Sequence, residues 1–413
     1  MKAASYVRGR GAGGGGRATA LKAFVLVAVL SLLLAATAAR AVVDGFEVGL
    51  QDGWVWQVAV LPPDEGWDSE QGRSAIAAIR LAEWEVMDSA DGIRGRDIRF
   101  LQEPPLDGES AASRVADWRK KGVSAVLSMS GGDDIPILRP LLAGKGPVLL
   151  SAYGEHENIL DADGAPDPMV FALDLYSDFR VQAFADYASA VLPAGSVVAL
   201  MADRLDPALE CRSRNLGEML SEKGFDSEYF WIPGGAMDSF RLMESEMVSS
   251  GAKVLITWAG SMVVRDVWRA TRLKTGGFEI WYGGAPQPLL LSFDGVVAAD
   301  QDYPVRTDAS LAPLLREIRR RLNLIVKDAA VAGRAYVACK WLFDAFGRSG
   351  SPAPSDLAAF MPLARGLAFG SQALSVNPLT HRPVERRVSF MKVAEKSFHP
   401  VNTLTVRGPE NLR

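Results

Sequence analysis

The stretch KVLITWAGSMVVRDVWRATRLKTGGFEIWYGG, residues 253–284, decides the fold of this chain. It opens with a short apolar run rich in β-branched residues, continues into a segment typical of a helix, and closes on a second apolar run that ends in two glycines. Short strands that are apolar on both faces and alternate with helices are typical of a parallel sheet covered by helices on each side. We therefore predict a strand–helix–strand unit here.

The same alternation extends over most of the chain. It begins with VWQVAVLP, which ends at Pro62, and continues through the predicted strands RDIRFLQ, SAVLSMS, PVLLSAY, MVFALDL, SVVALMAD and FDSEYFWI, with helical segments between them. This order predicts an α/β fold of doubly wound parallel sheets. A chain of 413 residues exceeds what one hydrophobic core usually holds, so we expect two lobes.

The C-terminal third departs from the alternation. Three helical stretches are predicted there, SLAPLLREIRRRLN, KDAAVAGRAYVACKWLFDAF and PSDLAAFMPLA. A hairpin is expected over residues 373–393, with its turn at Asn377, Pro378 and Pro383.

An export signal is predicted at residues 1–41. A basic segment with Lys2, Arg8 and Arg10 precedes the apolar run that starts at Ala23, and the small residues that follow favour cleavage before Val42. The alternative is a retained membrane anchor, which the short apolar core disfavours. No later apolar run is long enough to span a bilayer, so we expect no membrane insertion after cleavage.

Charge and cysteine content narrow the possible partners. The chain carries 45 Lys and Arg against 49 Asp and Glu, and all charges of the signal are basic, so its removal leaves a more acidic protein. Such a protein has no electrostatic reason to bind nucleic acid or an anionic membrane surface. Cys211 and Cys339 could form a disulfide in an oxidising compartment, but two buried thiols are favoured. No spacing of His or Cys predicts a zinc site.

No motif of a known catalytic centre is present. The sequence lacks a G-x-S-x-G elbow, a phosphate-binding P-loop, H-E-x-x-H and C-x-x-C, and no G-x-G-x-x-G follows the first strand. The three histidines leave few general bases near neutral pH. We expect neither an enzyme nor a bound cofactor or metal.

Residues suited to hold a small molecule follow several predicted strands. In doubly wound sheets, ligands bind outside the carboxyl ends of the strands. For any single residue, a role in a turn or in capping a helix explains its presence at least as well as ligand contact does. Asp203 and Ser261 in particular are suited to cap the helices that follow them. Their joint position at strand ends favours a binding site. The candidates are Trp67, Ser130, Gly131, Gly132, Tyr153, Gly154, Glu155, Asp203, Trp258, Gly260 and Ser261.

The order of these elements resembles that of type I periplasmic solute-binding proteins of the branched-chain amino acid receptor kind. VWQVAVLPPDEGWDSEQG resembles the opening strand and glycine loop of that family, GVSAVLSMSGG and GPVLLSAYGE its pair of strands ending in ligand loops, and SVVALMAD and VLITWAG two strand ends of its second lobe. The resemblance covers nearly all of the chain after the signal. It implies a first lobe of residues 42–173 and 305–370, and a second lobe of residues 174–304 and 371–413. A three-segment hinge would join the lobes near Asp174, Tyr303 and Ser371 and allow them to close over a ligand.

The resemblance also assigns roles to single residues. Ser130 matches the position that holds a ligand carboxylate, and Tyr153 and Glu155 match positions that bind the α-amino acid group. Gly260 and Pro207 match positions that are often aromatic. The acidic partner of the ligand ammonium would fall in GGAPQP, residues 283–288, where no carboxylate occurs. We hypothesise that Glu155 replaces it.

The function implied by the resemblance is that of a leucine-binding-like receptor in the periplasm. Such a receptor delivers a small polar solute, for example an amino acid or an amide, to an ABC permease in the inner membrane. The alternative is a periplasmic sensor module that passes ligand occupancy to a signalling or regulatory partner. The sequence alone does not separate these two functions.

Overall fold

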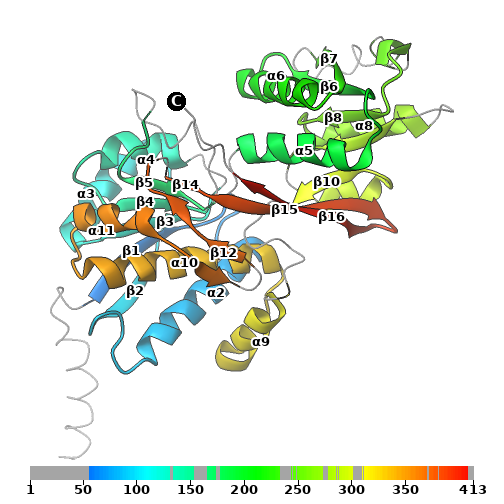
Figure 1. The fold of residues 1–413 in the computed structure, drawn as a ribbon. Helices are drawn as coiled ribbons and strands as arrows, with labels where there is room; N and C mark the ends of the chain where they lie inside the picture. Colours follow the sequence, from blue (N-terminus) through cyan, green and yellow to red (C-terminus); the bar gives the residue numbers. More distant parts are fainter. Residues whose placement is uncertain are drawn as a thin grey trace, which may run out of the picture. The chain divides into compact units, whose positions relative to one another are not determined.

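Two large sheets organise the part of the chain that the computed structural model describes (Figure 1). That part comprises residues 55–407 apart from 131–133, 153–164, 174–176, 233–242, 273–277, 301–308 and the single positions 244, 248, 285, 287, 310, 370, 371 and 380. One sheet has five strands in the order β2-β1-β3-β4-β5. The other has seven strands in the order β16-β15-β10-β9-β8-β6-β7. The prediction of an α/β fold with doubly wound parallel sheets is confirmed.

The first sheet pairs β1 with β3, β3 with β4 and β4 with β5 in parallel register. Alternate side chains of each strand enter different cores, because successive residues point to opposite faces of a sheet. Val58 and Val60 pack with α2, α10 and α11, whereas Ala59 and Leu61 pack with α3 and α4. The strands are β1 (Val55–Leu61), β2 (Asp97–Gln102), β3 (Ala125–Ser128), β4 (Val148–Ser151) and β5 (Val170–Ala172), and the helices are α2 (Glu70–Met87), α3 (Ala111–Lys121), α4 (Asp134–Leu142), α10 (Ala329–Ser349) and α11 (Pro354–Phe360).

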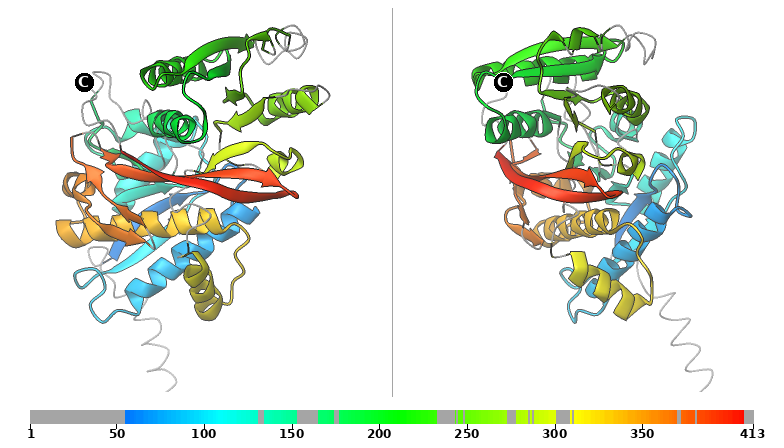
Figure 2. Two further views of the ribbon diagram at one scale, coloured as in Figure 1. Left: turned by 45° about the vertical axis from the view of Figure 1, so that its right-hand side comes forward. Right: turned by 90° about the vertical axis from the view of Figure 1, so that its right-hand side faces the viewer.

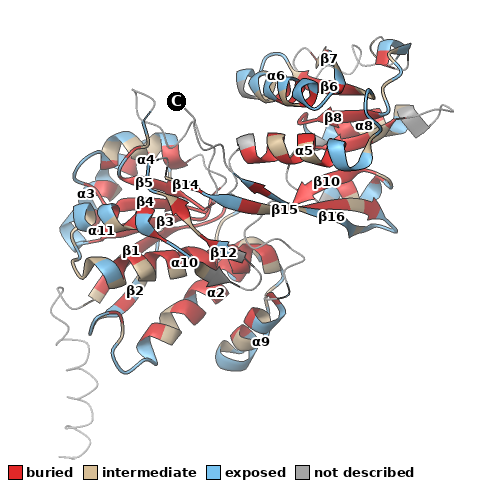
Figure 3. Cartoon of the chain, in the orientation of Figure 1, coloured by how far each residue is buried: buried red, intermediate tan, exposed pale blue. Residues whose placement is uncertain are grey.

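In the second sheet, five parallel strands are followed by two antiparallel ones. Val198 and Leu200 face α5 and α6, whereas Ala199 and Met201 face α8 and η3. The strands are β6 (Val197–Asp203), β7 (Asp226–Ile232), β8 (Val254–Thr257), β9 (Glu279–Tyr282), β10 (Val297–Asp300), β15 (Glu385–Ala394) and β16 (Ser397–Arg407). The helices are α5 (Ser177–Val191), α6 (Pro207–Glu222), α8 (Ser261–Arg272) and the 3-10 helix η3 (Pro288–Ser292). Figure 3 shows how continuously the central strands are buried.

The C-terminal third contains the three predicted helices, α9 (Leu311–Leu322), α10 and α11. Short elements follow them: η4 (Met361–Leu363), β11 (Leu367–Phe369) and β12 (Gln372–Leu374). The predicted hairpin is only partly right. Its turn does join a pair of two-residue strands, β13 (Val376–Asn377) and β14 (Arg382–Pro383).

The main C-terminal hairpin lies further along the chain. β15 pairs with β16 in a long antiparallel ribbon (Figure 2), whose turn holds Glu395 and Lys396 at φ of 52° and 56°. Hairpin turns that need positive φ at both central positions usually carry Asn or Gly. Because neither occurs here, the sequence pattern missed this turn.

Both cysteines are free thiols. Cys339 is buried in α10, as predicted, but the prediction of a buried thiol is wrong for Cys211, which is exposed. The expected lobe boundaries stay a prediction, since the three crossings fall at or beside residues that the structure does not describe. Within the described residues, no helix is both long enough and apolar enough to cross a membrane.

Candidate functional site

Three polar side chains gather where β3 ends and α4 begins. Ser128 donates its hydroxyl proton to Asp134 Oδ2 at 2.7 Å and lies 3.0 Å from Ser130 Oγ. Because Ser128 has a single hydroxyl proton, Ser130 is the donor between the two serines. The three residues are at most 8% exposed, so the structure brings the predicted residue Ser130 into a buried network at a strand end. Sequence analysis did not single out Ser128 or Asp134 as its partners.

Trp67 lies away from this network, beside the edge strand β2. Its Nε1 donates to the carbonyl oxygen of Glu103 at 2.6 Å, just beyond the carboxyl end of β2. The indole lines a cavity of about 600 Å³ together with Phe100 and Glu83. Burial raises the pKa of Glu83, although a hydrogen bond from the Phe100 N–H opposes this effect. The Trp67 side chain is thus held in place by its hydrogen bond to the Glu103 carbonyl oxygen.

Asp203 and Pro207 follow β6. The Asp203 carboxylate accepts a hydrogen bond from Leu205 N–H at 2.9 Å, which stabilises the turn out of the strand. The first turn of α6 is capped by Asp206, whose Oδ1 accepts from Leu209 N–H at 3.1 Å. Pro207 is exposed at the first position of this helix, where its missing N–H costs nothing.

Trp258 directly follows β8 and is only 6% exposed. Its ring meets Phe184 of α5 edge-on, with centroids 6.0 Å apart and planes at 75°. The indole edge lies against Gly283 at the end of β9, where a Cβ atom would overlap the ring. Among the described residues, Trp258 Nε1 has no hydrogen-bond acceptor. Gly260, two residues further on, is exposed and has open space where a side chain would be.

Arg180 contacts the same glycine as this tryptophan. It comes from the first turn of α5, is 8% exposed, and donates from Nη1 to the carbonyl oxygen of Gly283 at 3.0 Å. Burial raises the pKa of Tyr282, and the positive charge of Arg180 opposes part of that rise. The Tyr282 hydroxyl covers Gly284, where a Cβ atom would overlap it. Two aromatic rings and a buried guanidinium therefore occupy the carboxyl ends of β8 and β9.

Sequence analysis missed Arg180 and Gly283. The signal for Arg180 is its spacing of four residues from Phe184, which places both on one face of α5. Five predicted site residues lie outside the described part of the chain: Gly131, Gly132, Tyr153, Gly154 and Glu155. Ser261 opens α8, and its side chain is not described. The described residues contain no group of three or more His, Cys, Asp or Glu that could hold a metal ion.

Solved structures similar to this chain are solute-binding proteins. A leucine-binding protein, LivK, from Thermotoga maritima has 17% identity and a TM-score of 0.65, with 84% of this chain and 98% of that one covered. A substrate-binding protein of an ABC transporter from Desulfitobacterium hafniense, in complex with Leu, has 12% identity and a TM-score of 0.67 over 84% and 100%. A solute-binding protein from Rhodopseudomonas palustris, in complex with p-hydroxybenzoic acid, has 15% identity and a TM-score of 0.65 over 86% and 98%.

This chain has the type I periplasmic binding protein fold. No family model matches the sequence, and no curated protein sequence matches it either. The fold resemblance read from the order of elements is confirmed. In the type I fold seen here, Ser130 lies just beyond β3 of one sheet, whereas Asp203 ends β6 and Trp258 directly follows β8 of the other.

Proposed function

We propose that this protein is an extracytoplasmic receptor that binds a small organic solute and delivers it to an ABC permease. The observation that carries the proposal is the match of the fold to solute-binding proteins of ABC transporters over nearly the whole length of those proteins. Fold alone carries function only weakly, so the residues at the strand ends matter. The buried polar groups Ser130 and Arg180 lie at the carboxyl ends of parallel strands, where doubly wound sheets bind ligands.

The ligand is proposed to lie between two lobes built on the two sheets. The chain passes from β5 of the first sheet to β6 of the second, and returns from β10 to α9 and α10 before β15 rejoins the second sheet. This order supports the proposal that the chain crosses between the lobes three times, near Asp174, Tyr303 and Ser371. A ligand with higher affinity for the closed form then shifts the receptor toward it.

A binding role is favoured over catalysis. The structural neighbours are solute-binding proteins, and two of them are described in complex with leucine or p-hydroxybenzoic acid. Amino acids and small aromatic acids are accordingly the first solutes to test on this chain.

The proposal is tested by thermal unfolding of the purified protein in the presence of amino acids, amides and aromatic acids. A ligand at 100 times its Kd stabilises the folded state by about 2.7 kcal/mol, which raises Tm measurably. Small-angle scattering with and without the hit then reports closure of the lobes. A hit that is chemically converted during the assay would contradict the proposal.

Delivery to a permease is tested in cells. Deleting the gene should abolish uptake of the radiolabelled hit, and supplying the wild-type chain should restore it. Unchanged uptake together with the loss of a transcriptional response to the same solute would favour the sensor alternative.

We also propose that the protein acts in the periplasm after removal of residues 1–41. The basic segment, the apolar run and the small residues before Val42 support this proposal. Mass spectrometry of the protein from a periplasmic extract should give an N-terminus at Val42. A membrane-bound chain that begins at Met1 would show that the signal is retained as an anchor.

A further inference from the structure

Helix α9 and the loop that follows it concentrate positive charge. Residues 311–327 contain one acid, Glu317, and five basic residues: Arg316, Arg319, Arg320, Arg321 and Lys327. The chain as a whole has a net charge of −4. At physiological ionic strength a charge acts mainly within about 8 Å, so the local excess decides what can bind here. The segment is thus suited to an anionic partner, although the net charge of the chain predicts none.

The packing of α9 leaves its arginines on the outside. Leu314 and Ile318 are buried in the core that α9 shares with α2 and α10, and they fix which side of the helix faces inward. All four arginines of the helix are exposed, and Figure 3 shows exposed residues along α9. Because residues three and four apart lie on the same side of a helix, Arg316, Arg319 and Arg320 lie together on the surface.

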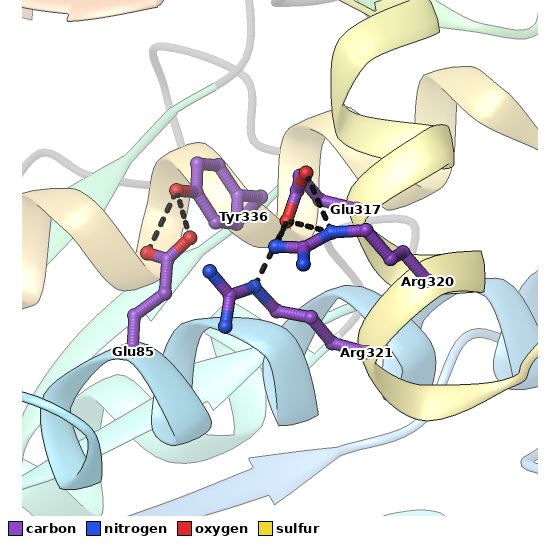
Figure 4. A network of polar contacts seen from close by, with 5 residues as sticks. All are labelled: Glu85, Glu317, Arg320, Arg321 and Tyr336. Carbon is purple, nitrogen blue, oxygen red and sulfur yellow. Dashed lines mark hydrogen bonds and ion pairs between the residues drawn. The ribbon is translucent and has the colours of Figure 1, made fainter.

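Two acids near this surface are already occupied (Figure 4). Glu317 accepts hydrogen bonds from Arg320 at 2.7 Å and from Arg321 at 2.9 Å. Glu85 of α2 accepts from the Tyr336 hydroxyl and forms an ion pair with Lys340 of α10. By contrast, Arg316 and Arg319 make no hydrogen bond or ion pair in the part of the chain that the structure describes. Both guanidinium groups are therefore available to an external anion.

An exposed apolar side chain follows the arginines. The helix ends at Asn323, whose φ of 54° is left-handed and whose N–H donates to the Arg319 carbonyl oxygen at 3.1 Å. In the loop beyond it, Leu324 and Val326 pack against the core, whereas Ile325 between them is 71% exposed. Basic residues beside an exposed apolar side chain suit a lipid surface, where cations meet headgroups and the apolar group enters the acyl boundary. A soluble acidic partner would need the arginines alone.

We propose that Arg316, Arg319, Arg320 and Ile325 form a surface, the α9 basic face, that docks on the anionic phospholipids of a membrane. The planar guanidinium group donates two parallel hydrogen bonds to a phosphate, which suits arginine to phospholipid headgroups. The contact is peripheral and reversible, and no helix inserts. This inference goes beyond the proposed receptor function and does not depend on the solute, so its failure leaves that function standing.

Vesicle flotation tests the partner. Protein purified from a periplasmic extract is mixed with vesicles of phosphatidylcholine alone, or of equal parts of phosphatidylcholine and phosphatidylglycerol. We expect the anionic vesicles to bind the protein more tightly by about tenfold or more. Binding should weaken as salt rises from about 0.1 M to about 0.5 M, because added ions screen the contact. Equal binding to both compositions, or binding to neither, would overturn the inference.

Charge-matched variants test the assigned arginines. Arg316→Gln combined with Arg319→Gln removes two exposed charges and should leave the fold intact, because neither side chain has a partner among the described residues. Binding to the anionic vesicles should weaken about 10- to 30-fold. Lys120→Gln combined with Lys145→Gln is the control, since it removes the same charge from exposed positions outside α9 and keeps the same N-terminus. Equal effects of the two pairs would overturn the assignment to α9.

Apolar variants separate a lipid surface from an acidic protein partner. Ile325→Ser should weaken binding to the anionic vesicles about 3- to 10-fold, because the isoleucine side chain leaves water when the α9 basic face docks. Leu379→Ser is the control, since Leu379 is 82% exposed and lies outside this face. Both variants should keep the wild-type Tm. Unchanged binding of Ile325→Ser would contradict the lipid contact, and the arginines would then fit an acidic protein segment.

Discussion

Gly72 and Gly347 both lie inside helices, yet their surroundings differ. Gly72 sits in the first turn of α2, and a Cβ atom there would meet the backbone oxygens of Gly66 and Trp67, the latter at 2.6 Å. Gly347 lies in the last turns of α10 and has nothing within 4 Å of its would-be Cβ. The close approach at Gly72 lets the loop after β1 pack on α2.

The first prediction concerns this pair of glycines. Gly72→Ala should lower the free energy of unfolding by about 1–3 kcal/mol, because backbone atoms cannot move aside as a flexible side chain can. Gly347→Ala should raise it by up to about 1 kcal/mol, since alanine loses less conformational freedom in a helix. Urea unfolding of both variants measures the difference. Stabilisation by Gly72→Ala would contradict the close approach.

The second prediction concerns Tyr336, whose hydroxyl lies 2.9 and 2.8 Å from the two oxygens of Glu85 (Figure 4). Burial and the negative charge of Glu85 raise the pKa of Tyr336 well above its ordinary value near 10. The folded state therefore keeps a proton that the unfolded state releases. The stabilisation is complete below about pH 10 and is lost as the pH rises further.

The measurement compares wild type with Tyr336→Phe in urea at pH 9, 10 and 11. Above pH 10 the wild-type free energy of unfolding should fall more steeply, by up to about 1.4 kcal/mol per pH unit. The variant keeps the other tyrosines with raised pKa, among them Tyr187 and Tyr282, so the difference between the two curves isolates the contribution of Tyr336. Parallel curves would show that the Glu85–Tyr336 contact does not hold the proton.

Among the helices, α9 contacts α2 through Arg321 and Trp84, and Figure 4 shows the ion pairs within α9 that hold this arginine. The Arg321 guanidinium lies 3.8 Å from the centroid of the Trp84 ring and donates to Glu317 at 2.9 Å. Hydrogen bonds from Arg320 and Arg321 lower the pKa of Glu317 to about 2. The stabilisation from the hydrogen bonds to Glu317 is present above the ordinary carboxyl pKa and is lost as the pH falls toward 2.

The third prediction is that Arg321→Ala loosens α9. Amide hydrogen exchange of residues 311–322 should become faster, whereas exchange in α10 should not change, because local opening follows local contacts. Arg319→Ala is the matched control on the same helix, since Arg319 is exposed and takes no part in these contacts. Equal exchange in the two variants would count against the role of the Trp84 contact.

For the molecule as a whole, the two thiols differ in their exposure and therefore in when they can react. Cys211 is exposed on α6, while Cys339 of α10 lies in the core that α10 shares with α2, where burial raises its pKa. A thiol reacts as the thiolate, so Cys339 can react only when the core opens.

The fourth prediction is that a thiol reagent labels one cysteine rapidly in the native protein. The second should react at the rate of global opening, and a reducing agent should not alter Tm, because no disulfide is present. Cys211→Ser should remove the rapid phase and leave the slow one. Rapid labelling of both thiols would contradict the burial of Cys339.

The sequence by itself determined the elements of the two sheets. Apolar runs such as VVALMA and VLIT predict central strands, because a strand that is buried on both faces has apolar residues at consecutive positions. The order of strands and helices then sufficed for the resemblance to the type I fold. The sequence also predicted that Ser130 and Trp258 lie at the sheet edge, because a residue that follows a buried strand must lie at the carboxyl end of that strand.

Tertiary structure alone decided which of these residues lie close together. The β15–β16 ribbon turns without glycine or asparagine, and β15 also pairs with β10, so no local signal in the sequence marked this hairpin. Trp258 and Arg180 both contact Gly283, which brings together three elements that lie far apart in the chain. A local sequence pattern indicates whether a residue is buried. It does not indicate which distant side chain packs beside that residue, and the polarity of the proposed site depends on these distant neighbours.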